Sequence, residues 1–341
     1  MMHELQQIPS RILFVLVVEK VIYMKMRNLG VTGLKVSELC VGTLPMGPLQ
    51  TNVPLDTGAE ILLHAMENGV NFFDTAQLYQ TYPYLKKACA QYARGKDVII
   101  VSKCTGSDYK TMEDAIIEAL RELGRDYIDI FLVHAARADE TVFEKRIGAI
   151  EALLKAKKKG LVRFTGISTH HTGLVAKAAG APEFDVVYPL INKSGLGILG
   201  GGLHEMLDAI ELLHKANKGF YAMKALAGGH LVGDMLDAIR YARAIPGMQA
   251  VSVGVTSIEE LNLQLRIFND EKIDPASLSG LKATKKIKIM PFLCSSCGTC
   301  IKSCPNGALS MEAKVPFVDE RACVLCGYCT PACPEFAIRL K

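Results

Sequence analysis

The chain lacks a strong excess of charge of either sign and lacks a long hydrophobic run. Lys and Arg number 39 against 35 Asp and Glu, so the net charge of +4 is too small to favour a nucleic acid or a membrane surface as partner. The most apolar stretch near the start, residues 12–18, is too short to span a bilayer, and no small-residue cleavage site follows it. We therefore expect a cytoplasmic protein with no nucleic-acid or membrane partner.

The composition is that of an ordinary globular protein, with 50% apolar, 22% charged and 7% aromatic residues. At 341 residues the chain has room for two domains, or for one large barrel with an appendage. Residues 1–25 match no pattern found later in the chain. We interpret them as an N-terminal extension, for which Met24 or Met26 is an alternative start.

Cysteine is abundant, and its distribution is uneven. Eight of the 11 cysteines lie in the last 48 residues, from Cys294 onward. They form two copies of C-x2-C-x2-C-x3-C-P, the second beginning at Cys323, and residues 294–309 and 323–338 agree at 7 of 16 positions. The tail is therefore an internal repeat, whose thiols are predicted to hold metal rather than to form disulfides.

This cysteine spacing suits two iron–sulfur cubanes. Three thiolates two residues apart can wrap one cluster, while the fourth cysteine, beyond the turn, ligates the other cluster. Ligation is then crossed between the repeats, with cluster I on Cys294, Cys297, Cys300 and Cys333, and cluster II on Cys323, Cys326, Cys329 and Cys304. Structural zinc is a weaker alternative, because zinc requires neither the third evenly spaced cysteine nor the Cys-Pro step.

Residues 290–341 resemble the bacterial two-[4Fe-4S] ferredoxins. The resemblance implies two [4Fe-4S] clusters, and we expect residues 286–341 to form a small ferredoxin-like α+β domain. Such clusters either carry electrons or only stabilise a domain too small to bury much core, and the sequence leaves both possibilities open.

The preceding region, residues 26–285, alternates apolar, β-branched runs with amphipathic helical stretches. Eight runs are predicted strands, in chain order residues 39–42, 71–74, 97–103, 128–134, 162–168, 185–188, 219–223 and 250–255. Near-continuous apolar strands suit a parallel sheet covered on both faces, and eight strand–helix units predict an α/β fold of the (β/α)8 TIM-barrel type. A Gly-x-Gly-x-x-Gly run at 195–200 lies too deep in the chain for a doubly wound dinucleotide fold, so we interpret it as a glycine-rich loop.

Two helix starts carry capping-box signatures, Thr111-x-x-Asp114 and Ser257-x-x-Glu260. The first helix is predicted to end at Gly124. The second starts after the last predicted strand, beside the barrel mouth. Free backbone N–H groups at a helix start form a ready phosphate site.

Chemistry in such barrels takes place at the carboxyl ends of the strands. Three consecutive predicted strands bring polar residues there: Asp74, with Tyr79 on the loop after it, then Lys103, then His134. Each alone is more often a cap or a rim residue, but together they can deliver a proton without a metal. A Lys103 ammonium held by Asp74 is expected to lower the pKa of Tyr79, and His134 can orient a substrate carbonyl.

These four residues and their flanks resemble the aldo-keto reductase family, as do residues 123–134 and 159–168. The resemblance covers about residues 26–270. It implies a catalytic tetrad in which Tyr79 is the general acid, Lys103 and Asp74 tune it, and His134 positions the carbonyl. It also implies a nicotinamide cofactor, NADP(H) or NAD(H), that gives hydride to an aldehyde or ketone. The combination with a two-cluster tail resembles the ferredoxin-fused branch of the family.

The resemblance further implies cofactor contacts from the later strands and loops: Ser168, Thr169, Tyr188, Met223, Lys224, Gly228, Gly254, Thr256 and Ser257. Three of these depart from the family, because Thr169, Tyr188 and Met223 stand where an Asn, a Gln and a stacking aromatic are usual. Lys224 and the glycines after it can still hold a pyrophosphate by charge and close backbone approach. No arginine clamp for a 2′-phosphate is visible, so the choice between NADP and NAD stays open.

Two histidines, His170 and His171, follow the fifth predicted strand. They could touch a substrate at the mouth, but a solvated loop is the favoured interpretation. Cys104, next to Lys103, is interpreted as a buried strand-end cysteine rather than a reactive thiol.

Two functions fit these patterns. The first is an oxidoreductase that transfers hydride between a nicotinamide and a small carbonyl or alcohol substrate, while the clusters exchange electrons with the barrel or with an external redox partner. The second is an iron–sulfur electron-transfer or sensing protein with a non-catalytic barrel. A nicotinamide moves two electrons as hydride and a cubane accepts one, and no flavin motif that could split the pair is visible. The complete tetrad favours the enzyme, and the altered nicotinamide contacts favour the alternative.

Overall fold

The computed structural model describes residues 24–274 and 286–340, apart from positions 331 and 336. Nearly all of the expected N-terminal extension lies outside these residues. The expected boundary at 285 and most of the segment joining the two domains lie outside them too, so the domain limits stay predictions.

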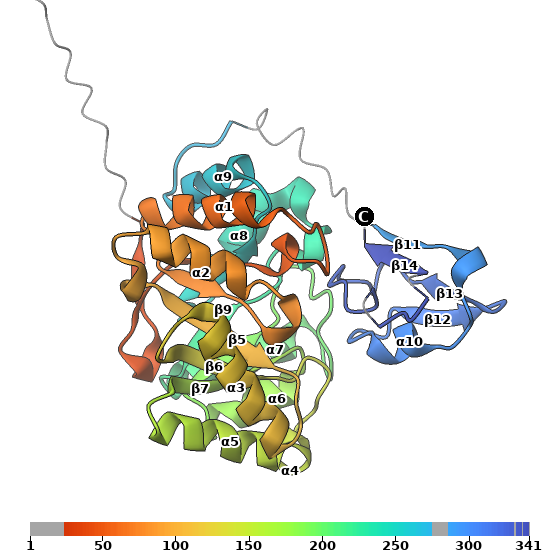
Figure 1. Ribbon diagram of the computed structural model, residues 1–341, viewed down its shortest axis with the longest axis horizontal. Helices are drawn as coiled ribbons and strands as arrows, with labels where there is room; N and C mark the ends of the chain where they lie inside the picture. The colour runs from red at the N-terminus through yellow and green to blue at the C-terminus, as the bar shows by residue number, and fades with distance from the viewer. Residues whose placement is uncertain (1–23, 275–285, 331, 336, 341) are drawn as a thin grey trace, which may run out of the picture.

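Eight parallel strands close into a barrel, which confirms the predicted TIM-barrel fold (Figure 1). The strands are β3 (Leu39–Gly42), β4 (Phe72–Asp74), β5 (Ile99–Cys104), β6 (Ile128–His134), β7 (Val162–Thr169), β8 (Val186–Pro189), β9 (Gly219–Ala222) and β10 (Ala250–Gly254). Pairing of β10 with β3 closes the ring. Every predicted strand is present, with its ends within two residues of the prediction.

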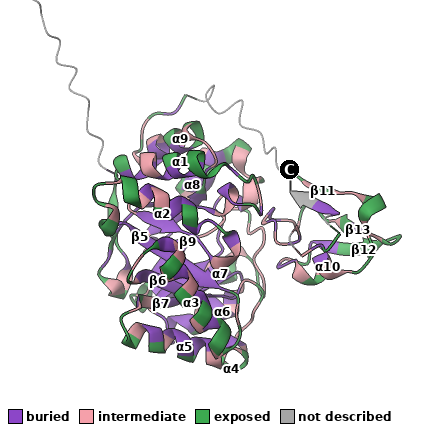
Figure 2. Ribbon diagram, in the orientation of Figure 1, coloured by how far each residue is buried: buried purple, intermediate pink, exposed green. Residues whose placement is uncertain are grey.

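Helices surround the barrel and bury one face each against its strands, which are the most buried elements in Figure 2. They are α1 (Leu55–Glu67), α2 (Tyr82–Gln91), α3 (Tyr109–Leu123), α4 (Val142–Lys145), α5 (Ile147–Lys158), α6 (Thr172–Ala179), α7 (Leu203–Lys215), α8 (Met235–Ala244) and α9 (Ile258–Phe268). Within the described ranges, none of the helices combines the length and the apolar character needed to cross a bilayer.

Helix α3 starts before its predicted capping box. Asp108 is the N-cap, because its carboxylate accepts the Thr111 N–H at 2.9 Å and the Thr111 hydroxyl at 2.7 Å. The prediction of Thr111 as the cap was wrong, since the stronger acceptor three residues earlier takes that place. Gly124 ends the helix in the left-handed region at φ 65°, as predicted.

A β-hairpin closes the amino-terminal end of the barrel. Strands β1 (Met26–Asn28) and β2 (Lys35–Ser37) pair antiparallel, and Leu29 and Val36 pack with the side chains inside the barrel. Gly30 lies against the start of β9, where an added Cβ would come within 2.3 Å of the Gly219 nitrogen. The carboxyl ends of the strands therefore form the mouth.

The C-terminal tail is a small α+β unit, as predicted. It pairs β11 (Ile287–Ile289) with β14 (Ile338–Leu340) and β12 (Leu309–Glu312) with β13 (Val315–Val318), and it contains the short helix α10 (Thr299–Ser303). Its small core consists largely of cysteines and short aliphatic side chains.

The tail lies against the barrel (Figure 1). Arg137 Nη1 donates to the Lys302 carbonyl at 2.6 Å, and Asn306 Nδ2 donates to the Gly197 carbonyl at 2.9 Å. An added Cβ on Gly197 would lie 2.7 Å from Val324 Cγ1. The glycine-rich loop at 195–200 therefore admits the tail at close range, which is a role that its sequence did not reveal.

Candidate active site

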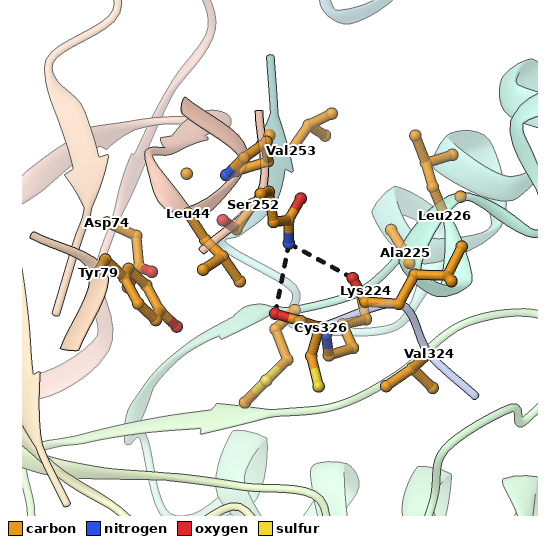
Figure 3. A pocket seen from close by; sticks show the side chains of 18 of the residues that line it. Leu44, Asp74, Tyr79, Lys224, Ala225, Leu226, Ser252, Val253, Val324 and Cys326 are labelled. Atoms are coloured by element: carbon orange, nitrogen blue, oxygen red, sulfur yellow. Dashed lines mark hydrogen bonds between the residues drawn. The ribbon is translucent and has the colours of Figure 1, made fainter. Parts of the chain in front are cut away.

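The barrel mouth and the tail together enclose a cavity of about 260 Å³. The barrel lines it with all four tetrad residues, and the tail lines it with Val324, Leu325, Cys326 and Tyr328. Figure 3 shows the two contributions facing each other, with Asp74 and Tyr79 on one side and Val324 and Cys326 on the other. The predicted catalytic residues are thus brought together, and the tail covers them.

Asp74 and Lys103 form a buried ion pair at the base of this cavity. Lys103 Nζ donates to Asp74 Oδ1 at 2.5 Å and to the Thr75 carbonyl at 2.7 Å. The Tyr221 hydroxyl donates to the other carboxylate oxygen of Asp74 at 2.9 Å. Burial raises the pKa of Asp74 and lowers the pKa of Lys103, and the ion pair opposes both shifts.

Tyr221, on β9, is a residue that the sequence interpretation missed. Its ring stacks on that of Tyr188, with centroids 3.9 Å apart and planes at 15°. A signal was available, because Tyr221 lies two residues before Met223, so both point to the same side of the predicted strand.

Tyr79 does not have the lowered pKa that was predicted. Burial raises the pKa of Tyr79 well above its ordinary value, and Tyr328 and Asp74 raise it further. Lys103 Nζ faces the Tyr79 ring, 5.0 Å from its centroid, and its charge is already paired with Asp74. The prediction was wrong because it ignored burial, and Tyr79 holds its proton in this arrangement.

His134 is neutral near pH 7, since burial and then Lys103 lower its pKa well below the ordinary value. Its Nε2 lies 3.0 Å from the Tyr328 hydroxyl, and its buried Nδ1 has no hydrogen-bond partner within the described part of the chain. A buried donor without a partner is costly, so we assign the proton to Nε2. His134 can therefore donate a hydrogen bond into the cavity.

His170 lines the same cavity and is 3% exposed, so its predicted place on a solvated loop was wrong. Strand β7 runs on to Thr169, and the Leu199 N–H donates to the His170 carbonyl at 2.9 Å. Burial and the charge of Lys224 lower the pKa of His170 to about 3. Its neighbour His171 is half-buried beside the glycine-rich loop. Cys104 is buried, as expected.

Most of the predicted cofactor residues line the cavity, namely Ser168, Tyr188, Met223, Lys224, Gly228, Gly254 and Thr256. Thr169 and Ser257 have other contacts: Thr169 Oγ1 accepts the His171 N–H at 3.0 Å, and Ser257 Oγ accepts the Glu260 N–H at 3.2 Å. Gly228 also touches the tail, because an added Cβ there would lie 1.8 Å from the Val324 carbonyl oxygen.

Ser168 has a buried hydroxyl oxygen with no hydrogen-bond partner among the described residues. It lines the cavity at the end of β7. A buried polar group without a partner is unfavourable, so the Ser168 hydroxyl suits a ligand amide, which could donate a hydrogen bond to it or accept one from it. The Ser168 side therefore fits the nicotinamide end of a cofactor.

The predicted phosphate site at the start of α9 holds a carboxylate of the protein itself. Glu260 Oε2 accepts the Thr256 N–H at 2.6 Å and the Thr256 hydroxyl at 3.0 Å. The capping box is therefore only half as predicted, because Ser257 caps the helix but Glu260 reaches Thr256 instead of Ser257. Lys224, half-buried in the cavity wall, is the remaining cationic candidate for a pyrophosphate.

The eight tail cysteines line two small cavities, in the grouping that crossed ligation predicts. Cys294, Cys297, Cys300 and Cys333 line one, and Cys304, Cys323, Cys326 and Cys329 line the other. All eight thiols are free. Within the described residues, no three His, Cys, Asp or Glu side chains gather closely enough to hold a single metal ion.

The backbone around both groups repeats as the sequence does. The Ala308 N–H donates to Cys304 Sγ at 3.2 Å, and the Ala337 N–H donates to Cys333 Sγ at 3.2 Å. Gly298 and Gly327 take matching left-handed conformations, at φ 70° and 79°. Such N–H groups aimed at sulfur suit thiolates that carry the charge of an iron–sulfur cluster.

Comparison with known proteins agrees with this geometry. Residues 38–261 match the profile described as the aldo/keto reductase family, and residues 293–338 match the profile described as a 4Fe-4S dicluster domain. The first match alone spans more than half of the chain.

Individual relatives are distant. L-galactose dehydrogenase of Arabidopsis thaliana is 32% identical over 163 residues, which cover 42% of this chain and 48% of the plant protein. The uncharacterized oxidoreductase YqkF of Bacillus subtilis is 22% identical over 307 residues, covering 77% of this chain and 97% of that protein.

Solved structures share the fold. A putative aldo-keto reductase from Pseudomonas aeruginosa superposes with a TM-score of 0.61 at 24% identity, covering 74% of this chain and 98% of the other. An aldo-keto reductase from Bacillus halodurans in its holo form gives 0.60 at 19% identity, covering 76% and 97%. With its closed barrel and its cysteine-rich tail, the chain belongs to the aldo/keto reductase family and carries a 4Fe-4S dicluster domain at its C-terminal end.

Proposed function

We propose that this oxidoreductase transfers hydride between a nicotinamide cofactor and an aldehyde or ketone, and that two [4Fe-4S] clusters exchange electrons with the same site, one electron each for the two electrons of a hydride, whose proton is exchanged with solvent. One observation carries the proposal: Cys326, a ligand of cluster II by the crossed assignment, lines the same cavity as the tetrad. A cluster that served only to stabilise the tail would need no place in that wall.

The barrel residues have the properties that carbonyl reduction requires. Tyr79 keeps its proton because its pKa is raised, so it can protonate a developing alkoxide. The Asp74–Lys103 pair holds a charge 5.0 Å from the Tyr79 ring centroid, and neutral His134 can orient the carbonyl oxygen through Nε2. In the reverse direction the same groups would take the proton of a small alcohol.

The nicotinamide would lie along the cavity wall and supply the hydride. The unpartnered Ser168 hydroxyl would hold its amide. The Lys224 ammonium would hold the pyrophosphate, while the Glu260 carboxylate at the start of α9 disfavours a phosphate there unless it moves away. The pocket therefore supports NADP(H) or NAD(H) without a preference between them.

We further propose that an external redox partner docks beside cluster I. Cys297 is exposed, whereas the second cysteine group faces the barrel through Cys326. Electrons from the partner would enter at cluster I and pass through cluster II to the tetrad.

The deciding experiment is an anaerobic titration of the iron-loaded protein with NADPH and then NADH. We expect the visible band of the clusters to bleach as the nicotinamide absorbance falls, and a carbonyl panel to be reduced. If carbonyls oxidise the nucleotide while the clusters stay unbleached, hydride transfer in the barrel stands and electron exchange with the clusters is rejected.

A second candidate is an electron-transfer or sensing protein with a non-catalytic barrel. One observation favours it, because Glu260 and Tyr328 engage groups that a cofactor and a substrate would need. We favour this second candidate if neither nucleotide binds, and neither is oxidised when a panel of carbonyls is present.

A further inference from the structure

Tyr328 lies in the tail between two predicted cluster ligands, yet its side chain reaches the tetrad of the barrel. Its hydroxyl is 3.0 Å from His134 Nε2 and 3.4 Å from the Tyr79 hydroxyl. It lines the cavity and packs beside Leu49 and Tyr79. Nothing in the cysteine motif predicts this contact.

We propose that the Tyr328 hydroxyl occupies the position of the substrate's carbonyl oxygen, so that a substrate binds by displacing it. Tyr328 is thereby a specificity-determining residue that the tail contributes to the barrel. The inference rests on the proposed function, because it takes Tyr79 and His134 as the two groups that hold a carbonyl.

The hydrogen-bond inventory supports this assignment. A carbonyl oxygen would accept from both the Tyr79 hydroxyl and His134 Nε2. In the structure the two groups converge on one oxygen atom, that of Tyr328. The Tyr328 hydroxyl oxygen can accept a hydrogen bond from the His134 Nε2–H, as a carbonyl oxygen would, so Tyr328 satisfies the site as the substrate would.

The segment that carries Tyr328 is fixed to the barrel on several sides. Gln50 Nε2 donates to the Leu325 and Cys326 carbonyls, each at 3.4 Å. The His230 ring nitrogen contacts the Cys323 carbonyl, and Gly228 allows the Val324 carbonyl to approach. These contacts fix the backbone of residues 323–326, which places Tyr328 beside the cavity, and the displacement by a substrate concerns its side chain.

Comparison of the two repeats separates Tyr328 from cluster binding. The first repeat has Cys297-Gly-Thr299-Cys300 where the second has Cys326-Gly-Tyr328-Cys329. Gly298 and Gly327 both take the left-handed conformation, although Thr299 begins helix α10 and Tyr328 lies in a turn. Thr is therefore compatible with the motif, and the tyrosine occurs in the repeat that faces the tetrad.

The test compares Tyr328→Thr, Tyr328→Phe and the wild type, all with clusters loaded. Benzoate, an unreactive oxygen acceptor, is titrated by calorimetry with and without NADP⁺, and 4-nitrobenzaldehyde reduction gives KM and kcat. Thr299→Ser in the first repeat is the matched control. Iron content and the visible spectrum of each variant establish that both clusters are intact.

Removal of the competing hydroxyl should strengthen benzoate binding about tenfold and lower KM by a similar factor in Tyr328→Thr, with little change in kcat. Tyr328→Phe, which keeps the ring, should gain less, and Thr299→Ser should match the wild type. Unchanged or weaker benzoate binding in both Tyr328 variants would overturn the assignment. A gain confined to Tyr328→Thr would assign the effect to the ring and overturn the role of the hydroxyl.

The two proposals can fail separately. If the wild type reduces no carbonyl with either nucleotide while Tyr328→Thr binds benzoate more tightly, the proposed function fails, and what stands is that the Tyr328 hydroxyl occupies an oxygen-binding position beside Tyr79 and His134. If the wild type reduces carbonyls and benzoate binding is the same in every variant, the assignment fails alone.

Discussion

The barrel and the tail build their sites in opposite ways. In the barrel, Asp74, Lys103 and His134 come from three strands separated by helices, and only closure of the sheet brings them together. In the tail, each repeat supplies its four cysteines from 11 consecutive residues, 294–304 and 323–333. A local motif therefore brings its own cysteines together, whereas the surroundings of those cysteines depend on the rest of the fold.

The tail also differs within itself. Cys297 of the first group is exposed, while Cys326 of the second lines the barrel cavity. Two segments with the same cysteine spacing therefore face different environments, and the difference between Thr299 and Tyr328 follows that asymmetry.

The largest expected effect is on catalysis in the barrel and leaves the clusters of the tail unchanged. Tyr79→Phe removes the proton donor, so kcat/KM for 4-nitrobenzaldehyde should fall by about 10²–10⁴-fold in steady-state assays with NADPH. Iron content and the cluster spectrum should stay those of the wild type. Unchanged carbonyl reduction would remove the tetrad mechanism.

The next effect separates the two cysteine groups. Cys297→Ser and Cys326→Ser should each lose about half of the bound iron, because each removes one ligand of a different cluster. Electron paramagnetic resonance of the reduced variants should show one cluster remaining in each. Full retention of iron in either variant would contradict the crossed ligand sets.

A smaller effect should show that the barrel tunes only the nearer cluster. The Lys224 charge acts on Cys326 and Cys323 and favours their negative forms. Lys224→Met should therefore lower the potential of cluster II by on the order of 50 mV, with cluster I unchanged, in a redox titration followed by electron paramagnetic resonance. Lys35→Met, an exposed change on β2, is the control. Equal shifts in both clusters would contradict the asymmetry.

The smallest effect concerns pH and the barrel. The pKa of His170 is lowered to about 3 in the folded chain, so below its ordinary pKa of about 6.5 the unfolded state binds a proton that the folded state does not. The stabilisation from neutral His170 is fully present above about pH 6.5. As the pH falls from there towards 3, the free energy of unfolding decreases by up to about 1.4 kcal/mol per pH unit.

His170→Asn removes this titration. Between pH 7.5 and about 5.5 the wild type should lose roughly 3 °C more in thermal midpoint than the variant, as followed by circular dichroism. The opposite difference, or none, would contradict the buried neutral state of His170.

Much of the fold could be predicted from the sequence. The eight strands are regular, apolar and separated by helical periodicity, so their positions follow from local patterns. The start of α3 could not be placed correctly, because Asp108 and Thr111 both suit an N-cap and the packed helix selects one. The pKa of Tyr79 could not be predicted either, since its burial depends on the tail as well as the barrel.

The barrel strands and the two cysteine repeats follow from the sequence alone, because they rest on periodicity and on fixed spacing along the chain, whereas the tetrad rests on strand-end positions and on the family resemblance. Three features became visible only in the folded chain: His170 is buried, Glu260 takes the phosphate position, and Tyr328 reaches Tyr79 and His134. The contact of Tyr328 with Tyr79 joins residues 249 positions apart. No local pattern encodes such a contact, because it exists only once the tail has packed over the mouth of the barrel.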